Sequence, residues 1–328
     1  MIAGPEGEVQ CVAGFGAALH WPTAYDNLIA TGVHTPYVFL VPIAATGTVA
    51  TALVVLTHLG WLGMAQCRKR GCGMLPCFLL TSGAPLLISV VRFIAVLAPR
   101  AWKLAGILAQ VFEASAFWGF LNLMLAFATA AAKQVGLDTA DALAALPAAK
   151  VWCLCSKPRV PSWSDVCIVQ VLVWQFIVTG ILISALHLFE FSERHKTLLS
   201  VLDVASLVVC FYGELVLVRT LGSLLEGRQS HLKLLGLKLL FIATTFSGRI
   251  SGLVFKNDME IHGLCYPAGA ISAAWAGAFT TLLCAVVAVI NFFAYTRSDL
   301  QAAEYGRSDL ESPADYGGTS AKSSHAGP

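Results

Sequence analysis

Charged residues are scarce in this sequence. Only 12% of its 328 residues are Asp, Glu, Lys or Arg, 57% are hydrophobic, and the mean hydropathy is +0.73. Soluble domains carry about 25% charged residues, which they need to cover a surface of this size. The scarcity therefore excludes a soluble enzyme, a nucleic-acid-binding protein and a disordered chain. It predicts a protein that crosses a lipid bilayer several times.

Other absences narrow the expectations further. The first 67 residues contain no Lys or Arg, and no basic segment precedes a long apolar run, so we expect no cleavable signal peptide. No Asn-x-Ser/Thr acceptor is present, so N-glycosylation is not expected. No Gly-x4-Gly-Lys-Ser/Thr loop is present, so ATP hydrolysis is not expected and no cofactor is predicted.

The apolar residues form long continuous runs without the alternation of a β-barrel, so they indicate helices. Seven runs reach the length of about 20 residues that a span requires. They are Pro36–Leu62, Leu79–Ala98, Leu104–Ala132, Val166–Phe189, Leu198–Leu225, Leu232–Val254 and Pro267–Tyr295. The predicted fold is an all-α, polytopic bundle of seven transmembrane helices.

Basic residues predict the orientation of this bundle, because cytoplasmic segments carry an excess of Lys and Arg. With the N-terminus outside, the inner segments hold twelve of the 21 basic residues, including Arg68, Lys69 and Arg70, and the outer loops hold five. The remaining four lie in or near spans. We therefore expect an N-terminus outside and a C-terminus in the cytoplasm.

Three regions follow from this layout: an extracytoplasmic arm over 1–35, the transmembrane domain over 36–295, and a disordered cytoplasmic tail over 296–328. The segment Gly136–Lys150 fits a short interfacial helix or a loose connector equally well. The tail is rich in Gly, Ser and acidic residues, and it repeats Arg-Ser-Asp-Leu at Arg297 and Arg307. A solvated tail is favoured over a phosphorylated or partner-binding one.

The ten cysteines show no zinc spacing, because Cys-x-x-Cys pairs and nearby His partners are absent. Inner juxtamembrane cysteines beside basic residues are typical sites of reversible palmitoylation, although inert thiols remain the alternative. On the outer side, Cys11 and Cys265 face an oxidising space and could form a disulfide. The palmitoylation candidates are Cys67, Cys72, Cys153 and Cys155.

Several ionisable residues fall at bilayer depth, where charge is costly and usually faces the bundle interior. Asp203 and Glu214 are 11 residues apart in the fifth span, about three helical turns, so they share a face. Lys238 and Arg249 repeat this spacing in the sixth span. Two interpretations stay open: ion pairs that hold the two spans together, or a polar path for an anionic or amphipathic solute. Arg92 and Glu113 add charge to the second and third spans.

The stretch from Ser206 to Phe241 resembles the family of the organic solute transporter alpha subunit and transmembrane protein 184. That family has a Ser in the fifth span followed six residues later by Tyr, here Ser206 and Tyr212, and a Lys-Phe-Leu-x-Val-Lys motif, here Lys233-Leu-Leu-Gly-Leu-Lys238. The seven-span layout with the N-terminus outside is also the family's. The resemblance covers about residues 36 to 295.

Shorter segments match in the same order. They are Val91-Arg92 with Pro99, Phe112-Glu113-Ala114, Trp174-Gln175-Phe176, and the inner-loop Cys153, Cys155 and Pro158. The chain departs from the family at Gly180, where a basic residue is common, and at Phe246-Ser247, where the family has an aromatic-Gln pair. Its cysteine cluster is also thinned. These departures bear on the substrate more than on the fold.

The resemblance implies facilitated transport of amphipathic anions such as bile-acid or steroid conjugates. It also implies a single-span beta-type subunit in some members; a homo-oligomer is the other arrangement we consider. Plasma, endosomal and vacuolar membranes are all compatible with the sequence. The candidate residues of the substrate path are Arg92, Glu113, Gln175, Asp203, Tyr212, Glu214, Lys238 and Arg249.

Two other functions have weaker support. A seven-span receptor fits the topology, but the third span does not end in Asp/Glu-Arg-Tyr, and the seventh has no Lys for a retinal Schiff base. An intramembrane enzyme would need paired catalytic groups, whereas Asp203 is the one clear intramembrane Asp. We therefore expect a non-enzymatic transporter, with a seven-span receptor as the alternative.

Overall fold

The computed structural model describes residues 2–3, 9–10, 24, 37–66, 74–148, 157–186, 196–261 and 264–310. The helices are α2 (Tyr37–Gln66), α3 (Leu75–Ser82), α4 (Ala84–Leu97), the 3-10 helix η2 (Pro99–Ala101), α5 (Trp102–Gln134), α6 (Thr139–Ala144), α7 (Trp163–Leu186), α8 (Lys196–Thr220), α9 (Ser230–Val254), α10 (Ala268–Ala294) and α11 (Arg297–Leu310). Two antiparallel pairs of short strands are β1 (Ile2–Ala3) with β2 (Val9–Gln10), and β3 (Met259–Ile261) with β4 (Leu264–Tyr266).

The fold is an all-α polytopic membrane protein, as the hydropathy of the sequence predicts. Within the described ranges, six helices are long and apolar enough to cross a bilayer, and the bent pair α3 and α4 forms the seventh candidate. Six predicted spans each coincide with one helix, and their ends differ by a few residues. Helices of 23 or more residues exceed the length of about 20 that a bilayer requires.

The second span is a broken helix rather than the single run expected over Leu79–Ala98. It begins at Leu75, and α3 and α4 meet at Gly83 with a bend of 47°. Pro85 explains the break, because it has no backbone N–H to donate to the carbonyl oxygen of Thr81 four residues earlier. The side-chain amide of Asn291 on α10 lies 3.5 Å from that oxygen and takes the place of the missing donor.

Helix α5 lies at the centre of the bundle. Of its most apolar 18-residue window, 72% is buried inside the protein, compared with 28–50% for the other five long helices. Helix α10 packs along α2, α4 and α9. Hydroxyl groups join α9 to α10, with 2.9 Å between the Oγ of Ser247 and the Oγ1 of Thr280 and 2.9 Å between the Oγ atoms of Ser251 and Ser272. Such small polar residues let membrane helices approach closely.

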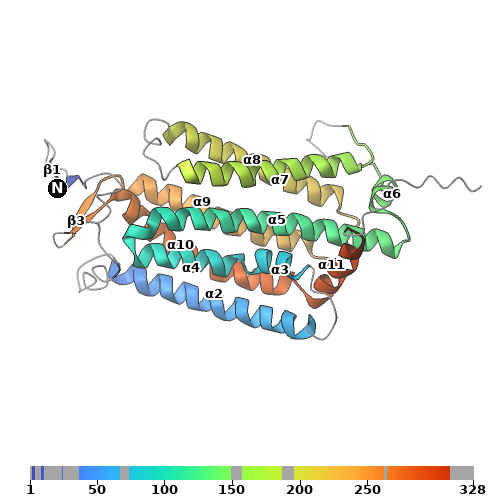
Figure 1. The fold of residues 1–328 in the computed structure, drawn as a ribbon, viewed down its shortest axis with the longest axis horizontal. Helices are drawn as coiled ribbons and strands as arrows, with labels where there is room; N and C mark the ends of the chain where they lie inside the picture. Colours follow the sequence, from blue (N-terminus) through green and yellow to red (C-terminus); the bar gives the residue numbers. More distant parts are fainter. Residues whose placement is uncertain are drawn as a thin grey trace, which may run out of the picture.

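Helices α7 and α8 form a separate antiparallel pair on one side of the bundle (Figure 1). The pair joins the rest mainly through α7, which packs along α5. Helix α8 packs along α7 and has no comparable backbone packing against α5 or α9 among the described elements. Side chains therefore fill the space between α8 and the centre of the bundle.

The two ends of the bundle differ. Figure 1 shows β1 and β3 at one end and α6 and α11 at the other. The predicted orientation puts the strands outside and the two short helices inside, and we use "outer" and "inner" in that sense. Helix α6 falls within Gly136–Lys150, in agreement with the helical alternative for this segment.

The chain after Thr296 differs from the solvated tail that the composition predicts. Residues Arg297–Leu310 form α11, which packs against α5 and buries Leu300 and Ala303. The buried apolar residues of α11 are few, but Leu300, Ala302 and Ala303 lie on one face, which average composition does not reveal. At Gly306 a Cβ would come within 2.1 Å of the Ala126 carbonyl oxygen, so this close approach requires glycine. Residues 311–328 of the predicted tail and most of the predicted arm over 1–35 lie outside the described residues.

Candidate functional site

Four charged side chains from four helices gather in the outer half of the bundle. We call Arg92 (α4), Glu113 (α5), Asp203 (α8) and Arg249 (α9) the outer cluster. Glu113 is only 3% exposed and interacts electrostatically with both Arg92 and Asp203. Asp203 pairs with Arg249 at 3.7 Å. The structure therefore brings together predicted site residues that are far apart in sequence.

The Asp203–Arg249 contact of the outer cluster is partly exposed to solvent, and one donor of Arg92 is unpaired among the described residues. The Asp203 and Arg249 side chains remain 34% and 40% exposed, so solvent weakens their attraction. The Arg92 Nε is buried and has no hydrogen-bond partner in the described part of the chain. Buried guanidinium groups normally use their donors, because an unpaired one is costly. The outer cluster therefore has unused capacity to bind an anionic group.

A second charged pair lies nearer the inner end. Glu214 on α8 is 1% exposed, and within the described residues neither of its carboxylate oxygens has a hydrogen-bond partner. Lys238 on α9 is the oppositely charged group that acts on it electrostatically. Their separation leaves the carboxylate buried without direct neutralisation, which is expensive at bilayer depth. We call Glu214 and Lys238 the inner pair.

Four phenylalanine rings lie between the outer cluster and the inner pair. We call Phe117 (α5), Phe176 (α7), Phe211 (α8) and Phe241 (α9) the phenylalanine quartet. Five of its six ring pairs make edge-to-face contacts, with centroids 5.2–5.8 Å apart. Such pairs add about 0.5–1.5 kcal/mol each beyond the area they bury.

On both α8 and α9, the quartet residue lies between the outer charge and the inner charge, at the same offsets on the two helices. On α8, Phe211 follows Asp203 by eight residues, about 12 Å of helix, and precedes Glu214 by about 4.5 Å. On α9, Phe241 has the same offsets from Arg249 and Lys238. The rings of Phe117, Phe176 and Phe241 are buried. The outer cluster and the inner pair are therefore separated by a closed aromatic layer.

Two predicted path residues have other surroundings. The amide of Gln175 on α7 makes two hydrogen bonds with Ser206 on α8: its Nε2 donates to the Ser206 carbonyl at 3.0 Å, and its Oε1 accepts from the Ser206 Oγ at 3.1 Å. The Ser206 Oγ also lies 2.6 Å from the Thr179 Oγ1. Gln175 thus joins α7 to α8. Tyr212 on α8 is 37% exposed.

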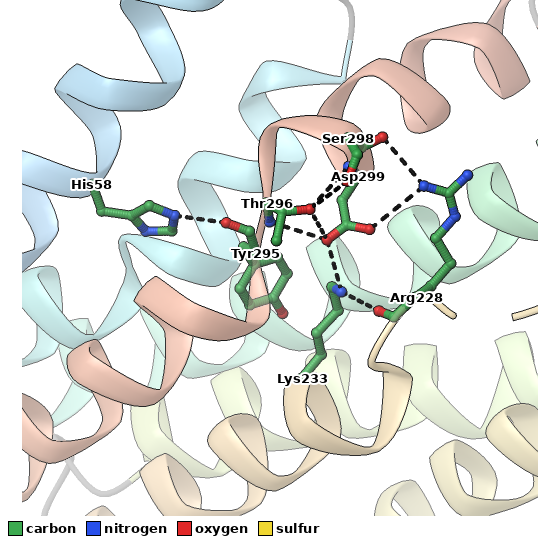
Figure 2. A network of polar contacts seen from close by, with 7 residues as sticks. All are labelled: His58, Arg228, Lys233, Tyr295, Thr296, Ser298 and Asp299. Atoms are coloured by element: carbon green, nitrogen blue, oxygen red, sulfur yellow. Dashed lines mark hydrogen bonds and ion pairs between the residues drawn. The ribbon is translucent and has the colours of Figure 1, made fainter. Parts of the chain in front are cut away.

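Sequence reasoning missed a buried network at the inner end of the bundle (Figure 2). Lys233, one of the twelve basic residues of the predicted inner segments, is fully buried. Its Nζ donates to the Asp299 Oδ2 at 3.0 Å and to the Arg228 carbonyl. Asp299 also accepts from the backbone N–H and the hydroxyl of Thr296, both at 3.0 Å. A Thr followed three residues later by an acid is a signal of a helix start, but hydropathy placed this stretch in the tail.

Tyr295 links this network to α2 and α3. Its backbone carbonyl lies 2.8 Å from the Nε2 of the buried His58 on α2. Its ring packs edge-to-face against Phe78 of α3, and the Lys233 Nζ lies 5.4 Å from its centroid. Burial raises the pKa of the Tyr295 hydroxyl above its usual range, so the phenol stays neutral. The network fixes α11 to the inner end and does not line the space around the quartet.

Of the cysteines singled out in the sequence, Cys265 is the one that lies among the described residues, and it is disulfide-bonded. Cys11 and the four palmitoylation candidates, Cys67, Cys72, Cys153 and Cys155, lie outside the described residues. In the part of the chain that is described, no group of three His, Cys, Asp or Glu side chains could hold a metal ion.

Comparison with known proteins gives one result. A family model described as "Organic solute transporter Ostalpha" matches residues 43–300, which is most of the chain and includes every helix from α3 to α10. No curated protein and no solved structure matches the chain.

Proposed function

Because the chain belongs to the organic solute transporter Ostalpha family, we propose that it carries amphipathic organic anions, such as bile-acid or steroid conjugates, across the membrane by facilitated transport. The outer cluster, the phenylalanine quartet and the inner pair are its proposed path. The observation that carries this proposal is the gathering of charges from α4, α5, α8 and α9, in which Glu113 and Glu214 are buried and the Asp203–Arg249 pair is partly exposed. This gathering links residues matched by the family model into one chemical surface.

The chemistry of the path suits a solute with an anionic head and an apolar body. Arg92, Arg249 and Lys238 can attract the head, and the rings of the quartet can accept the body. The acids Glu113, Asp203 and Glu214 keep each cation partly neutralised when no solute is bound, which lowers the cost of charge at bilayer depth. A solute anion can then exchange with a protein carboxylate rather than bind to an isolated cation.

The test is flux into proteoliposomes that contain the purified full chain. We expect the protein to accelerate uptake of radiolabelled taurocholate or a sulfated steroid over empty liposomes. Lys238→Ala should lower this flux about tenfold, because a charge-assisted contact of about 1.5–3 kcal/mol corresponds to at least that factor. Glu113→Ala should also lower it, because Arg92 then loses the carboxylate that partly neutralises it. Glu226→Ala and Lys256→Ala are matched controls, because both residues are exposed and outside the path.

Unchanged flux in both path variants would remove these residues from the mechanism.

We further propose that the protein works with a single-span subunit of the beta type or as a homo-oligomer. Co-purification from native membranes tests this point. If taurocholate and the sulfated steroid fail to cross even in the presence of the co-purified partner, the proposed substrate class is wrong.

A further inference from the structure

Helices α7 and α8 behave structurally as one unit. Gln175, Thr179 and Ser206 join them through hydrogen bonds of 2.6–3.1 Å at the middle of both helices. At Gly213 of α8, an added Cβ would come 3.1 Å from the Leu172 Cβ of α7, so the two backbones are close. Figure 1 shows the pair lying together along one side of the bundle. We call this pair the α7–α8 hairpin.

The interface between the α7–α8 hairpin and α9 is much looser than the interface within the hairpin. The polar contacts across it include the half-exposed Asp203–Arg249 pair at 3.7 Å and the Glu214–Lys238 attraction, in which the Glu214 oxygens have no hydrogen-bond partner in the described chain. By contrast, α9 and α10 pack along each other and share hydroxyl contacts of 2.9 Å. Backbone packing on α9 is therefore much weaker for the hairpin than for α10.

The phenylalanine quartet is divided across this interface. Phe176 and Phe211 belong to the hairpin, whereas Phe117 and Phe241 belong to α5 and α9. Edge-to-face contacts of Phe176 and Phe211 with Phe241 hold the aromatic layer closed between the hairpin and α9. Movement of the hairpin would separate these rings and, at the same time, separate Asp203 from Arg249 and move Glu214 relative to Lys238.

We infer that the phenylalanine quartet is the gate of the transport path, and that the α7–α8 hairpin is the half of the gate that moves, with its close packing on α5 as the hinge. This inference rests on the proposed function. Opening leaves the hairpin itself and the packing of α9 on α10 intact, because the interactions that it breaks lie between α8 and α9 or within the quartet. The charges freed by opening are the ones that a passing anion would meet.

Cross-linking tests the inference. A variant with Asp203→Cys and Arg249→Cys is bridged across α8 and α9 with a short bifunctional thiol reagent in taurocholate-transporting proteoliposomes. Two matched controls form bonds within one unit: Thr179→Cys with Ser206→Cys inside the hairpin, and Ser251→Cys with Ser272→Cys between α9 and α10. We expect bridging of the first pair to lower flux about tenfold, because the conformational step becomes blocked. Bonds in the two control pairs should leave flux within about twofold of the reduced protein.

Equal flux before and after bridging at positions 203 and 249, with the bridge verified by mass spectrometry, would overturn the inference. Equal inhibition by the bond at positions 179 and 206 would overturn it as well. Absence of flux in the unmodified protein is a different failure and would count against the proposed function.

Where the unbridged variant at positions 203 and 249 is itself inactive, the gate is tested directly with trapped carboxyfluorescein. Phe241→Ala should release the dye faster than Phe78→Ala, which removes an equally buried ring outside the quartet. Equal release from the two variants would overturn the inference.

Discussion

At the scale of single residues, the buried charges divide into satisfied and unsatisfied groups. Lys233 is satisfied, since its ammonium group reaches Asp299, the Arg228 carbonyl and the faces of two aromatic rings. Glu214 is unsatisfied, because no described group donates to its carboxylate. A satisfied buried charge fits a structural role, whereas an unsatisfied buried polar group lowers stability and calls for another explanation.

Replacement of Lys233 by Met should destabilise the protein by about 3–5 kcal/mol, because it leaves Asp299 buried without the cation nearest to it. The double variant Lys233→Met with Asp299→Asn should recover most of this loss, since the buried carboxylate is then removed as well. Thermal denaturation in detergent measures both effects. Arg297→Ala is the control, because this half-buried residue contacts Trp61 at the protein surface. Equal melting temperatures for Lys233→Met and wild type would contradict a structural role for this residue.

Replacement of Glu214 by Gln should change transport rather than stability. The melting temperature should stay unchanged, because Gln matches the side chain in size and no hydrogen bond within the described chain is lost. Taurocholate flux should fall, because the inner pair loses its acid. Glu226→Gln changes an exposed residue in the same way and should alter neither quantity. A large loss of stability in Glu214→Gln would identify this residue as structural.

At the scale of elements, the sequence predicts features that depend on local hydropathy and spacing, and it misses features that depend on contacts between helices. The long spans were predictable, because an apolar run of about 20 residues must be a helix in lipid, whatever its neighbours are. The facing charges on α8 and α9 were also predictable, since the 11-residue spacing places each pair on one face. The bend at Gly83 was missed, because Ser82-Gly83-Ala84-Pro85 is apolar enough for a window average to pass over it.

The phenylalanine quartet and α11 were missed for a different reason. The quartet joins four helices, and nothing in any one helix distinguishes its Phe from the others, of which the sequence has 18 in all. Helix α11 buries only a narrow apolar face, and its attachment depends on Lys233, more than 60 residues earlier in the chain. Prediction of the quartet and of α11 requires the tertiary arrangement, because hydrophobic periodicity and composition describe one helix at a time.

Helix α11 gives a prediction at this scale. Gly306→Ala should displace α11 from α5, since the new Cβ would lie 2.1 Å from the Ala126 carbonyl oxygen. Overpacking of this kind costs about 1–3 kcal/mol. Hydrogen exchange over residues 297–306 should become faster in this variant. Gly60→Ala on α2 has open space around its Cβ and should leave exchange unchanged. Unaltered exchange in both variants would mean that α11 does not depend on this close approach.

At the scale of the whole molecule, charge distribution and disulfide chemistry make one linked prediction. The excess of inner Lys and Arg predicts an N-terminus outside, and this orientation places Cys11 and Cys265 in an oxidising space. Cys265 lies in β4 opposite Glu260 of β3, and β2, which ends at Gln10, lies beside β3. Cys265 is disulfide-bonded, and Cys11 directly follows Gln10, so we predict that these two cysteines are partners.

An intact cell should therefore show three results together. A tag before residue 1 should be accessible without permeabilisation, and a tag after residue 328 only with it. A membrane-impermeant maleimide should not label Cys265 in the unmodified chain, because its thiol is in a disulfide, but should label it from outside in Cys11→Ser. A tag before residue 1 that is reached only after permeabilisation would reverse the orientation, and failure of Cys11→Ser to expose the Cys265 thiol would exclude the pairing. The two outcomes are separable, because tag access depends on which side of the bilayer the termini occupy, whereas thiol release depends on which cysteine is bonded to Cys265.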